Sequence, residues 1–213
     1  MIDNILLDVR HLKKYFPIER GFLRKTVGYV KAVDDISFYI KEGEILALVG
    51  ESGCGKTTTA RCILRAIEPT SGTVLLKVDS EMVDVTQLKK EELRKVRRYM
   101  QMVFQNPYTS LNPRMKIKEI IGEPLLVNKI AKGKELEKKI EELMVAVGLR
   151  PEYMIRYPHA FSGGQRQRLV IARALALNPK LVICDEPVAA LDVSIRAQIL
   201  NLFMELRDKF NLT

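Results

Sequence analysis

Among its 213 residues the chain has no tryptophan, and it has only three cysteines and two histidines. Cys54, Cys62 and Cys184 cannot all pair and lack the spacing of metal ligands, which argues against a disulfide framework and favours free thiols in a reducing compartment. No stretch approaches the roughly 18 consecutive apolar residues that a membrane-spanning helix needs. The sequence therefore predicts a globular protein that is made and stays in the cytoplasm.

The chain carries an excess of basic residues, with a formal net charge of +9. Such an excess indicates an acidic partner, either nucleic acid or the anionic surface of a membrane. The densest basic clusters, at residues 94–98 and 132–139, lie among glutamates in segments with a helical pattern. This pattern favours solvated helix faces, so we expect no nucleic-acid partner.

Two short apolar runs indicate strands of a parallel sheet. Residues 44–49 end at Gly50 and predict a buried strand, followed by a helix from about residue 55 to 67. Residues 181–184 predict a second buried strand, and residues 193–210 a helix. Strands followed by helices in this way predict an α/β fold with a doubly wound sheet, in which ligands bind at the carboxyl ends of the strands.

The remaining segments suggest how the domain is organised. Residues 6–10 and 30–40 predict a small amino-terminal β layer, and the longest irregular region is expected around residues 17–28. Residues 106–161 are rich in helix formers and predict an inserted helical subdomain. We therefore expect a single domain over residues 1–213, with the α/β core formed by residues 1–105 and 162–213.

The segment GESGCGKT, residues 50–57, has the spacing of a phosphate-binding loop between a strand and a helix. Its glycines let backbone N–H groups point at phosphate oxygens, and the helix amino terminus adds positive partial charge. Lys56 would reach the β- and γ-phosphates, and the Thr57 hydroxyl would bind Mg²⁺. The candidate phosphate-binding residues are Gly50, Ser52, Gly53, Cys54, Gly55, Lys56, Thr57 and Thr58.

Two adjacent carboxylates follow the strand predicted at residues 181–184. Asp185 would reach the Mg²⁺, and Glu186 could accept a proton from an attacking water. Carboxylates this close repel each other unless a cation or a reaction uses them. Gln105, after the strand-like residues 100–104, could place its amide near the metal or the water, or could be a surface residue before a turn.

A second glycine-rich stretch, FSGGQRQRL, covers residues 161–169. Ser162 is suited to cap the amino end of a helix over residues 163–176. Gly163 and Gly164 would weaken the start of this helix by about 1 kcal/mol each. Their presence indicates that some group approaches the backbone closely, and phosphate is the obvious candidate.

The chain resembles the ATPase subunit of an ABC transporter from about Leu6 to the last residue. The motifs that carry this resemblance are GESGCGKT, Gln105, FSGGQRQRL, LVICDEP and the ALD that follows it. The resemblance implies ATP and Mg²⁺ as ligands. It also implies a head-to-tail dimer, in which the second glycine-rich stretch covers the nucleotide held by the partner. Ser162 and Gly164 would then contact that partner's γ-phosphate. The resemblance extends the nucleotide-contacting set to Gly163, Gln165 and Asp192.

A closer similarity is to the second ATPase of oligopeptide and dipeptide importers. It implies that Tyr15 stacks on adenine, with Phe16 as the competing residue, and that Gln105 and the loop after it contact the membrane subunits. The implied partners are a second, related ATPase, two transmembrane permease subunits and, indirectly, an extracytoplasmic solute-binding protein. The implied location is the cytoplasmic face of the membrane.

The sequence departs from the family pattern in two places. The family has a γ-phosphate-binding histidine after a further strand downstream of Asp192, whereas the chain ends at Thr213 and its histidines, His11 and His159, lie upstream. We therefore expect the carboxyl-terminal part to be missing and hydrolysis by this chain to be weak. Ala189 stands where the family usually has serine.

Other functions stay open at this point. Related ATPases serve nickel and oligosaccharide importers, and the cargo does not touch this subunit. A soluble ABC-type ATPase acting on DNA or ribosomes would need long coiled coils or a second cassette. A P-loop kinase would leave FSGGQRQRL without a role, and the guanine-reading pattern of a GTPase fails because Ala131 follows Asn128 and Lys129.

Overall fold

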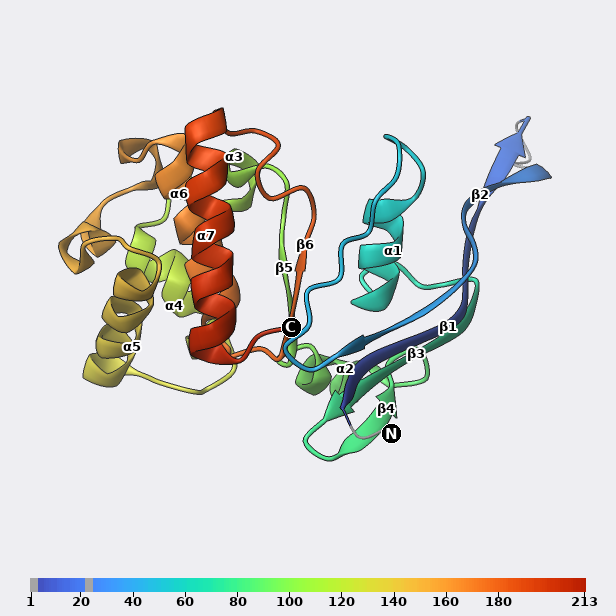
Figure 1. Cartoon of the computed structure of the whole chain (residues 1–213), viewed down its shortest axis with the longest axis horizontal. Coiled ribbons are helices and arrows are strands. Elements are labelled where there is room, and N and C mark those ends of the chain that lie inside the picture. Colours follow the sequence, from blue (N-terminus) through green and yellow to red (C-terminus); the bar gives the residue numbers. More distant parts are fainter. Residues whose placement is uncertain (1–3, 22–24) are drawn as a thin grey trace. The chain divides into compact units, whose positions relative to one another are not determined.

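The computed structural model describes residues 4–21 and 25–213, which form two compact units (Figure 1). Unit 1 comprises the chain up to Arg97 together with Thr213, and unit 2 comprises Arg98–Leu212. Each unit has its own sheet and helices and is described separately. No helix in the described residues is long and apolar enough to cross a membrane.

Unit 1 is built on a four-stranded antiparallel sheet. The strand order is β2-β1-β3-β4. Leu7 lies opposite Leu76 and Val9 opposite Val74, and all four side chains are fully buried. These cross-strand apolar pairs set the register, since a shift by one residue would move them to the opposite face. The strands are β1 (Ile5–Arg20), β2 (Lys25–Lys41), β3 (Ser71–Val78) and β4 (Glu81–Asp84).

The predicted β layer exists but extends well beyond its predicted limits. The expectation of an irregular region around residues 17–28 was wrong for its described part, because β1 continues to Arg20 and β2 begins at Lys25. Residues 22–24 lie outside the described residues. Pro17 is tolerated because β3 pairs with β1 only up to Lys13, so Pro17 faces a strand on one side alone.

Two helices complete unit 1, α1 (Lys56–Ile63) and α2 (Lys90–Val96). The helix predicted from about residue 55 to 67 is therefore present, but it ends earlier, and bonded turns continue to Ile67. α1 buries one face, made of Thr59, Ala60, Cys62 and Ile63. This face packs on β1 and β2.

The predicted buried strand at residues 44–49 is not formed. These residues have no assigned secondary structure and no strand pairing, and Val49 is 89% exposed and Ile45 56% exposed. A strand needs a neighbour for its backbone groups. In the described part of unit 1 no strand pairs with these residues, and its sheet consists of β2, β1, β3 and β4. Of the expected doubly wound parallel sheet, the described residues form two parallel strands, and both lie in unit 2.

Unit 2 contains these two parallel strands and a set of helices (Figure 1). β5 (Met100–Val103) pairs with β6 (Leu181–Cys184), which confirms the strand predicted at residues 181–184 and the strand-like character of residues 100–104. The predicted helices at 163–176 and 193–210 are confirmed within one residue. The α-helices are α3 (Pro107–Ser110), α4 (Ile117–Val127), α5 (Gly133–Ala146), α6 (Gly163–Leu175) and α7 (Val193–Phe210), with 3₁₀ turns at Pro151–Ile155 and Pro158–Ala160.

One hydrophobic core holds unit 2 together. Buried side chains from α4, α5, α6 and α7, such as Ile121, Ile140, Leu169 and Ile199, belong to the same cluster as Val103 of β5. The helical residues 106–161 therefore pack with residues 162–212. The division by packing falls after Arg97, whereas the division expected from the sequence, at 105/106 and 161/162, stays a prediction.

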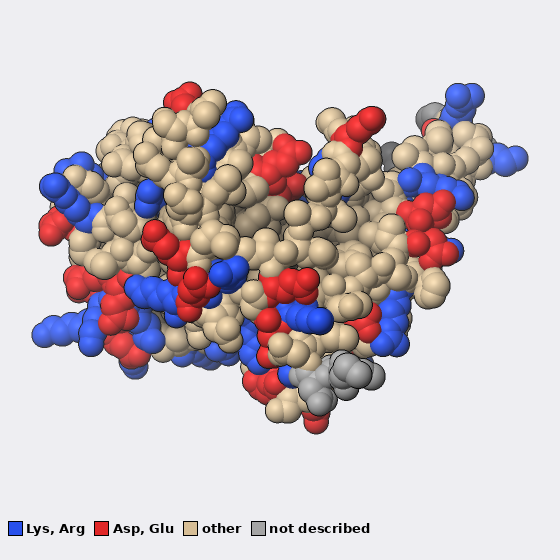
Figure 2. Space-filling model, viewed as in Figure 1, with Lys and Arg blue, Asp and Glu red and all other residues tan. Residues whose placement is uncertain are grey.

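Charged side chains of both signs are mixed over the face of the molecule shown in Figure 2. The basic cluster at residues 94–98 spans the end of α2, and that at residues 132–139 falls largely in α5. Within α5, Lys139 lies 3.9 Å from Glu135 one turn away. Both clusters thus lie on helices that also carry glutamates, as the sequence predicted.

Candidate nucleotide-binding residues

Residues 50–57 form a loop that leads directly into α1 of unit 1. Gly53 and Gly55 have φ angles of +83° and +98°, which L-residues rarely adopt. A Cβ on Gly55 would lie 2.0 Å from the carbonyl oxygen of Ala32 in β2, so only glycine fits there. Gly55 occupies the N-cap of α1 and, having no side chain, cannot itself cap the first N–H groups of the helix.

Lys56 curls back over this loop. Its Nζ donates hydrogen bonds to the carbonyl oxygens of Gly50 and Glu51, both at 2.7 Å, and lies 3.9 Å from Sγ of Cys54. The ammonium group therefore bridges two backbone carbonyls at the start of the loop. The sequence-predicted residues Ser52, Gly53, Thr57 and Thr58 belong to the same loop and first helical turn.

Tyr15, the residue expected to stack on adenine, lies on β1 of the same unit. Its hydroxyl donates a hydrogen bond to Oδ1 of Asp34, and this bond raises the pKa of Tyr15 and lowers the pKa of Asp34. The ammonium of Lys31 lies 5.3 Å from the centre of the tyrosine ring. Phe16 has a similar neighbour, Lys14, at 4.9 Å. The choice of Tyr15 over Phe16 stays a prediction.

In unit 2, the carboxyl ends of β5 and β6 bring two predicted residues together. Nε2 of Gln105 donates a hydrogen bond of 2.7 Å to Oε2 of Glu186, although the two are 81 positions apart. The backbone N–H of Asp185 donates to the carbonyl of Val103 at 2.9 Å, which extends the parallel pairing by one residue. Glu186 then turns the chain with a φ of 46°, an unusual value for a non-glycine residue.

The second glycine-rich stretch begins α6 as predicted. Ser162 caps the helix: its Oγ accepts from the N–H of Gln165, whose side-chain oxygen accepts from the N–H of Ser162 in return. The close approach expected at the glycines occurs within the chain, because a Cβ on Gly164 would lie 2.6 Å from Cγ2 of Ile195 in α7. A phosphate contact at Ser162, Gly163 and Gly164 stays a prediction.

Asp192 is the N-cap residue of α7 and is exposed. Its carbonyl accepts from the N–H of Arg196, and the Arg196 guanidinium donates to the carbonyls of Leu191, at 2.7 Å, and Ala189. Arg196 therefore holds the whole loop that presents Asp192. Arg196 could not be identified from the sequence, because its acceptors are backbone carbonyls that no side-chain pattern reveals.

The described structure thus sorts the predicted residues into two sets. Unit 1 holds the glycine-rich loop, its lysine and threonines, and Tyr15. Unit 2 holds Gln105 beside Glu186, Asp185, the capped α6 and the loop before α7. A glycine-rich loop opening a helix, with a separate strand that ends in Asp-Glu, is the pattern of a P-loop nucleotide-binding protein.

The chain belongs to the ABC transporter family, whose sequence profile matches residues 33–189. It is 54% identical over 212 residues to the oligopeptide transport ATP-binding protein AppF of Bacillus subtilis, covering 99% of this chain and 63% of AppF. It is 50% identical over 205 residues to the di/tripeptide transport ATP-binding protein DppF of Pseudomonas aeruginosa, covering 96% of this chain and 62% of DppF. The chain thus spans less than two thirds of the length of these curated relatives.

Solved structures agree with this assignment. The ATP-binding cassette MJ0796, in a dimeric post-hydrolysis state bound to ADP and Pi, matches with a TM-score of 0.79 at 30% identity, over 96% of this chain and 84% of that one. CbiO1 from Clostridium perfringens, part of the transporter complex cbiONQ, matches with a TM-score of 0.79 at 26% identity, over 99% and 76% of the two chains. The fold is therefore that of an ABC ATPase cassette.

Proposed function

We propose that the protein to which this chain belongs binds and hydrolyses Mg-ATP to drive the import of oligopeptides or dipeptides through an ABC transporter. The observation that carries the proposal is the hydrogen bond between Gln105 and Glu186, which joins an amide and a carboxylate at the ends of two parallel strands. The relatives named for oligopeptide and di/tripeptide transport support the kind of cargo.

The phosphates of the nucleotide would lie on the loop that opens α1. The positive φ angles of Gly53 and Gly55 shape this loop, and the uncapped N–H groups of α1 favour an anion. Lys56 already spans the loop through two carbonyl oxygens, so its ammonium would exchange them for phosphate oxygens when the nucleotide binds. The donors present therefore fit a triphosphate.

Glu186 would act as the general base and Gln105 as the group that orients it. An ionised carboxylate can accept a proton from the attacking water, and the amide of Gln105 holds one of its oxygens at 2.7 Å. Thr57, Gln105 and Asp185 provide the oxygen atoms that Mg²⁺ prefers, and the bound ion would neutralise charge on the phosphates. The exposed position of Glu186 leaves it open to a water molecule.

The capped end of α6 would serve the nucleotide of a second subunit. Ser162, Gly163, Gly164 and Gln165 form this end, and Asp192 lies on the loop before α7. In a head-to-tail dimer each ATP would be bound by the loop of one subunit and the α6 end of the other. Support comes from the related cassette MJ0796, whose structures are dimeric. We propose a related but different ATPase as the partner.

Two transmembrane permease subunits and an extracytoplasmic solute-binding protein complete the proposed importer, which places this subunit on the cytoplasmic face of the membrane. The glutathione import ATP-binding protein GsiA of Pectobacterium atrosepticum, 50% identical over 207 residues, extends the related cargoes to a modified tripeptide. Peptide-like molecules therefore fit the relatives better than nickel or oligosaccharides do.

The experiment that tests this proposal is purification of the tagged, full-length protein from membranes of its own cell. Mass spectrometry should find two multi-spanning proteins, a second ATPase and a solute-binding protein whose ligand identifies the cargo. The control is the same purification with a Lys56→Ala protein, which should still assemble but lose Mg-ATP binding. Recovery of ribosomes or DNA in place of membrane proteins would refute the importer and favour a soluble ABC-type ATPase.

A further inference from the structure

The residue just beyond the carboxyl end of α1 has an unusual backbone conformation. Arg65 has a φ of 49°, in the left-handed region, at the position where a helix usually ends on glycine. The turn itself is regular, since the N–H of Arg65 donates to the carbonyl of Cys62 and that of Ala66 to the carbonyl of Arg61. A non-glycine residue is strained there and persists only where its surroundings hold it in place.

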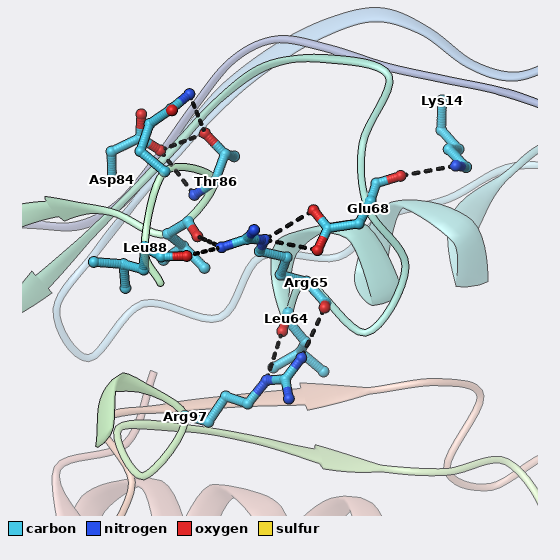
Figure 3. Close-up of polar contacts among 10 residues, drawn as sticks. Lys14, Leu64, Arg65, Glu68, Asp84, Thr86, Leu88 and Arg97 are labelled. Atoms are coloured by element: carbon cyan, nitrogen blue, oxygen red, sulfur yellow. Dashed lines mark hydrogen bonds and ion pairs between the residues drawn. The ribbon is translucent and has the colours of Figure 1, made fainter. Parts of the chain in front are cut away.

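The Arg65 side chain reaches across to the connection between β4 and α2. Its Nε donates to both carboxylate oxygens of Glu68, at 3.0 and 2.8 Å, and its Nη1 donates to the carbonyls of Val85 and Leu88. Figure 3 shows the guanidinium between Glu68 and Leu88. Only 17% of the side chain is exposed. A glycine would relieve the backbone strain but would lose all of these bonds.

A second arginine makes the reverse connection. Arg97 is the C-cap of α2, and its guanidinium donates to the carbonyls of Leu64, at 3.3 Å, and Arg65, at 2.7 Å, at the end of α1 (Figure 3). These carbonyls have no partner within a helix that ends there, and a cation at this end also suits the helix dipole. Arg65 thus binds backbone oxygens of the connection that leads into α2, and Arg97, at the end of α2, binds backbone oxygens at the end of α1.

The helix held in this way is the one that opens with the phosphate loop. α1 has only eight residues, and its first turn contains Lys56 and Thr57. At its amino end the tight contact of Gly55 with the Ala32 carbonyl leaves no room to move inward. At its carboxyl end the two arginines fix its position. Because so short a helix moves as a rigid body, loosening one end displaces the loop at the other.

We propose that Arg65 and Arg97 form a reciprocal clamp that positions α1, and with it the phosphate loop, for the nucleotide. The inference rests on the proposed function, in that it assigns the nucleotide to this loop. Arg65 and Arg97 are positioning residues and do not touch the nucleotide. Their effect passes through the backbone of α1 to Lys56, Thr57 and the N–H groups of the first turn.

The test measures binding of a fluorescent ATP analogue with Mg²⁺ to the full-length protein, well below the unfolding temperature of every variant. Arg97→Gln and Arg65→Gly should each raise the dissociation constant about fivefold, the size of effect found for residues that couple to a site without touching its ligand. Arg94→Gln, an exposed arginine on the same α2, is the matched control and should leave the constant unchanged.

Two further readouts separate positioning from general stability. Arg65→Gly removes the strained φ, so its unfolding temperature should fall less than that of Arg97→Gln while its affinity falls as much. Amide hydrogen exchange in α1 should quicken in both variants, and the double variant should bind scarcely worse than either single one, because each breaks the same clamp. Arg65→Lys keeps the positive charge but loses the planar guanidinium with its several N–H donors, so it should bind the analogue no more tightly than Arg65→Gly does.

The results distinguish the two proposals. If the wild type binds the analogue and both variants bind within twofold of Arg94→Gln, the clamp is overturned and the proposed function stands. If the wild type itself does not bind the analogue, the proposed function is refuted, and so is the role of the clamp in positioning α1 for a nucleotide. Additive losses in the double variant would also overturn the clamp, because they would show two independent contacts.

Discussion

Gln105 donates a hydrogen bond of 2.7 Å to Glu186, and the two residues stand at the same end of adjacent parallel strands. The register that pairs Val103 with Cys184 places Gln105 and Glu186 each two residues beyond the last pair. The amide donor binds one oxygen of the Glu186 side chain, Oε2. The contact therefore fixes the position of the side chain that the proposed mechanism uses as general base.

The first prediction concerns this carboxylate. Glu186→Gln in the full-length protein should lower the rate of ATP hydrolysis by about 10²- to 10⁴-fold, because an amide cannot accept the proton of the attacking water. Binding of Mg-ATP should persist, since the phosphate loop is untouched. Phosphate release measures the rate, and Glu205→Gln on the exposed side of α7 is the control. Hydrolysis at the wild-type rate would remove Glu186 from the mechanism.

The second prediction concerns Gly55. Gly55→Ala and Gly53→Ala both place a side chain at a positive φ, which costs about 1–2 kcal/mol. Only Gly55→Ala also drives a Cβ to 2.0 Å from the Ala32 carbonyl, so it should cost roughly 1–3 kcal/mol more. Urea unfolding of the two variants measures the difference. Equal losses would mean that the loop does not pack on β2 as described.

Several elements could be predicted from the sequence because their signals are local. Ser162 with Gln165 three residues later specifies a helix start, and the apolar spacing over residues 193–210 specifies a helix of that length. The phosphate loop and the Asp-Glu at the end of β6 are contiguous motifs. Each needs no partner from a distant part of the chain to be recognised.

Other features depend on partners that the sequence does not name. Residues 44–49 have the composition of a buried strand, but pairing decides whether a strand forms, and the described unit 1 provides no pairing there. Arg97 and Arg196 donate to backbone carbonyls, which every residue has, so no pattern of side chains indicates them. The pairing of Arg65 with Glu68 three residues later likewise gives no sign of the bonds that Arg65 makes to distant carbonyls. Gly164 was recognised as a place of close approach, but its neighbour, Ile195, is 31 positions away and on another helix.

The third prediction tests that neighbour. Alanine is preferred over glycine inside a helix by about 1 kcal/mol, yet a Cβ on Gly164 would overlap Cγ2 of Ile195 at 2.6 Å. We expect Gly164→Ala to destabilise the wild type by roughly 1–2 kcal/mol because the overlap outweighs the preference. In an Ile195→Ala background the same change should stabilise. A double-mutant cycle by urea unfolding measures the sign change, and its absence would place the two helices apart.

The fourth prediction concerns Gln167 in α6. This side chain is fully buried, and neither of its polar atoms has a hydrogen-bond partner among the described residues. An unsatisfied buried amide costs about 1–3 kcal/mol, so Gln167→Met, of similar shape, should raise the free energy of unfolding by roughly 1 kcal/mol. Gln165→Met is the contrasting variant, because it removes a capping hydrogen bond and should destabilise. Loss of stability in Gln167→Met would show that the amide has a bound partner.

The fifth prediction follows from the contact between Tyr15 and Asp34. The phenol hydroxyl and then Lys31 lower the pKa of Asp34 through hydrogen bonds to its carboxylate. A carboxyl group whose pKa is lower in the folded state stabilises the fold above its unfolded pKa, and this contribution disappears as the pH falls through the folded pKa. Tyr15→Phe removes the larger of the two hydrogen bonds, so the pKa of Asp34 should rise toward its ordinary value, and the stability lost on acidification should become smaller. NMR titration of the Asp34 carboxyl carbon in the wild type and in Tyr15→Phe measures this. An unchanged pKa in Tyr15→Phe would mean that the hydroxyl does not bind Asp34 in solution and is available to another partner.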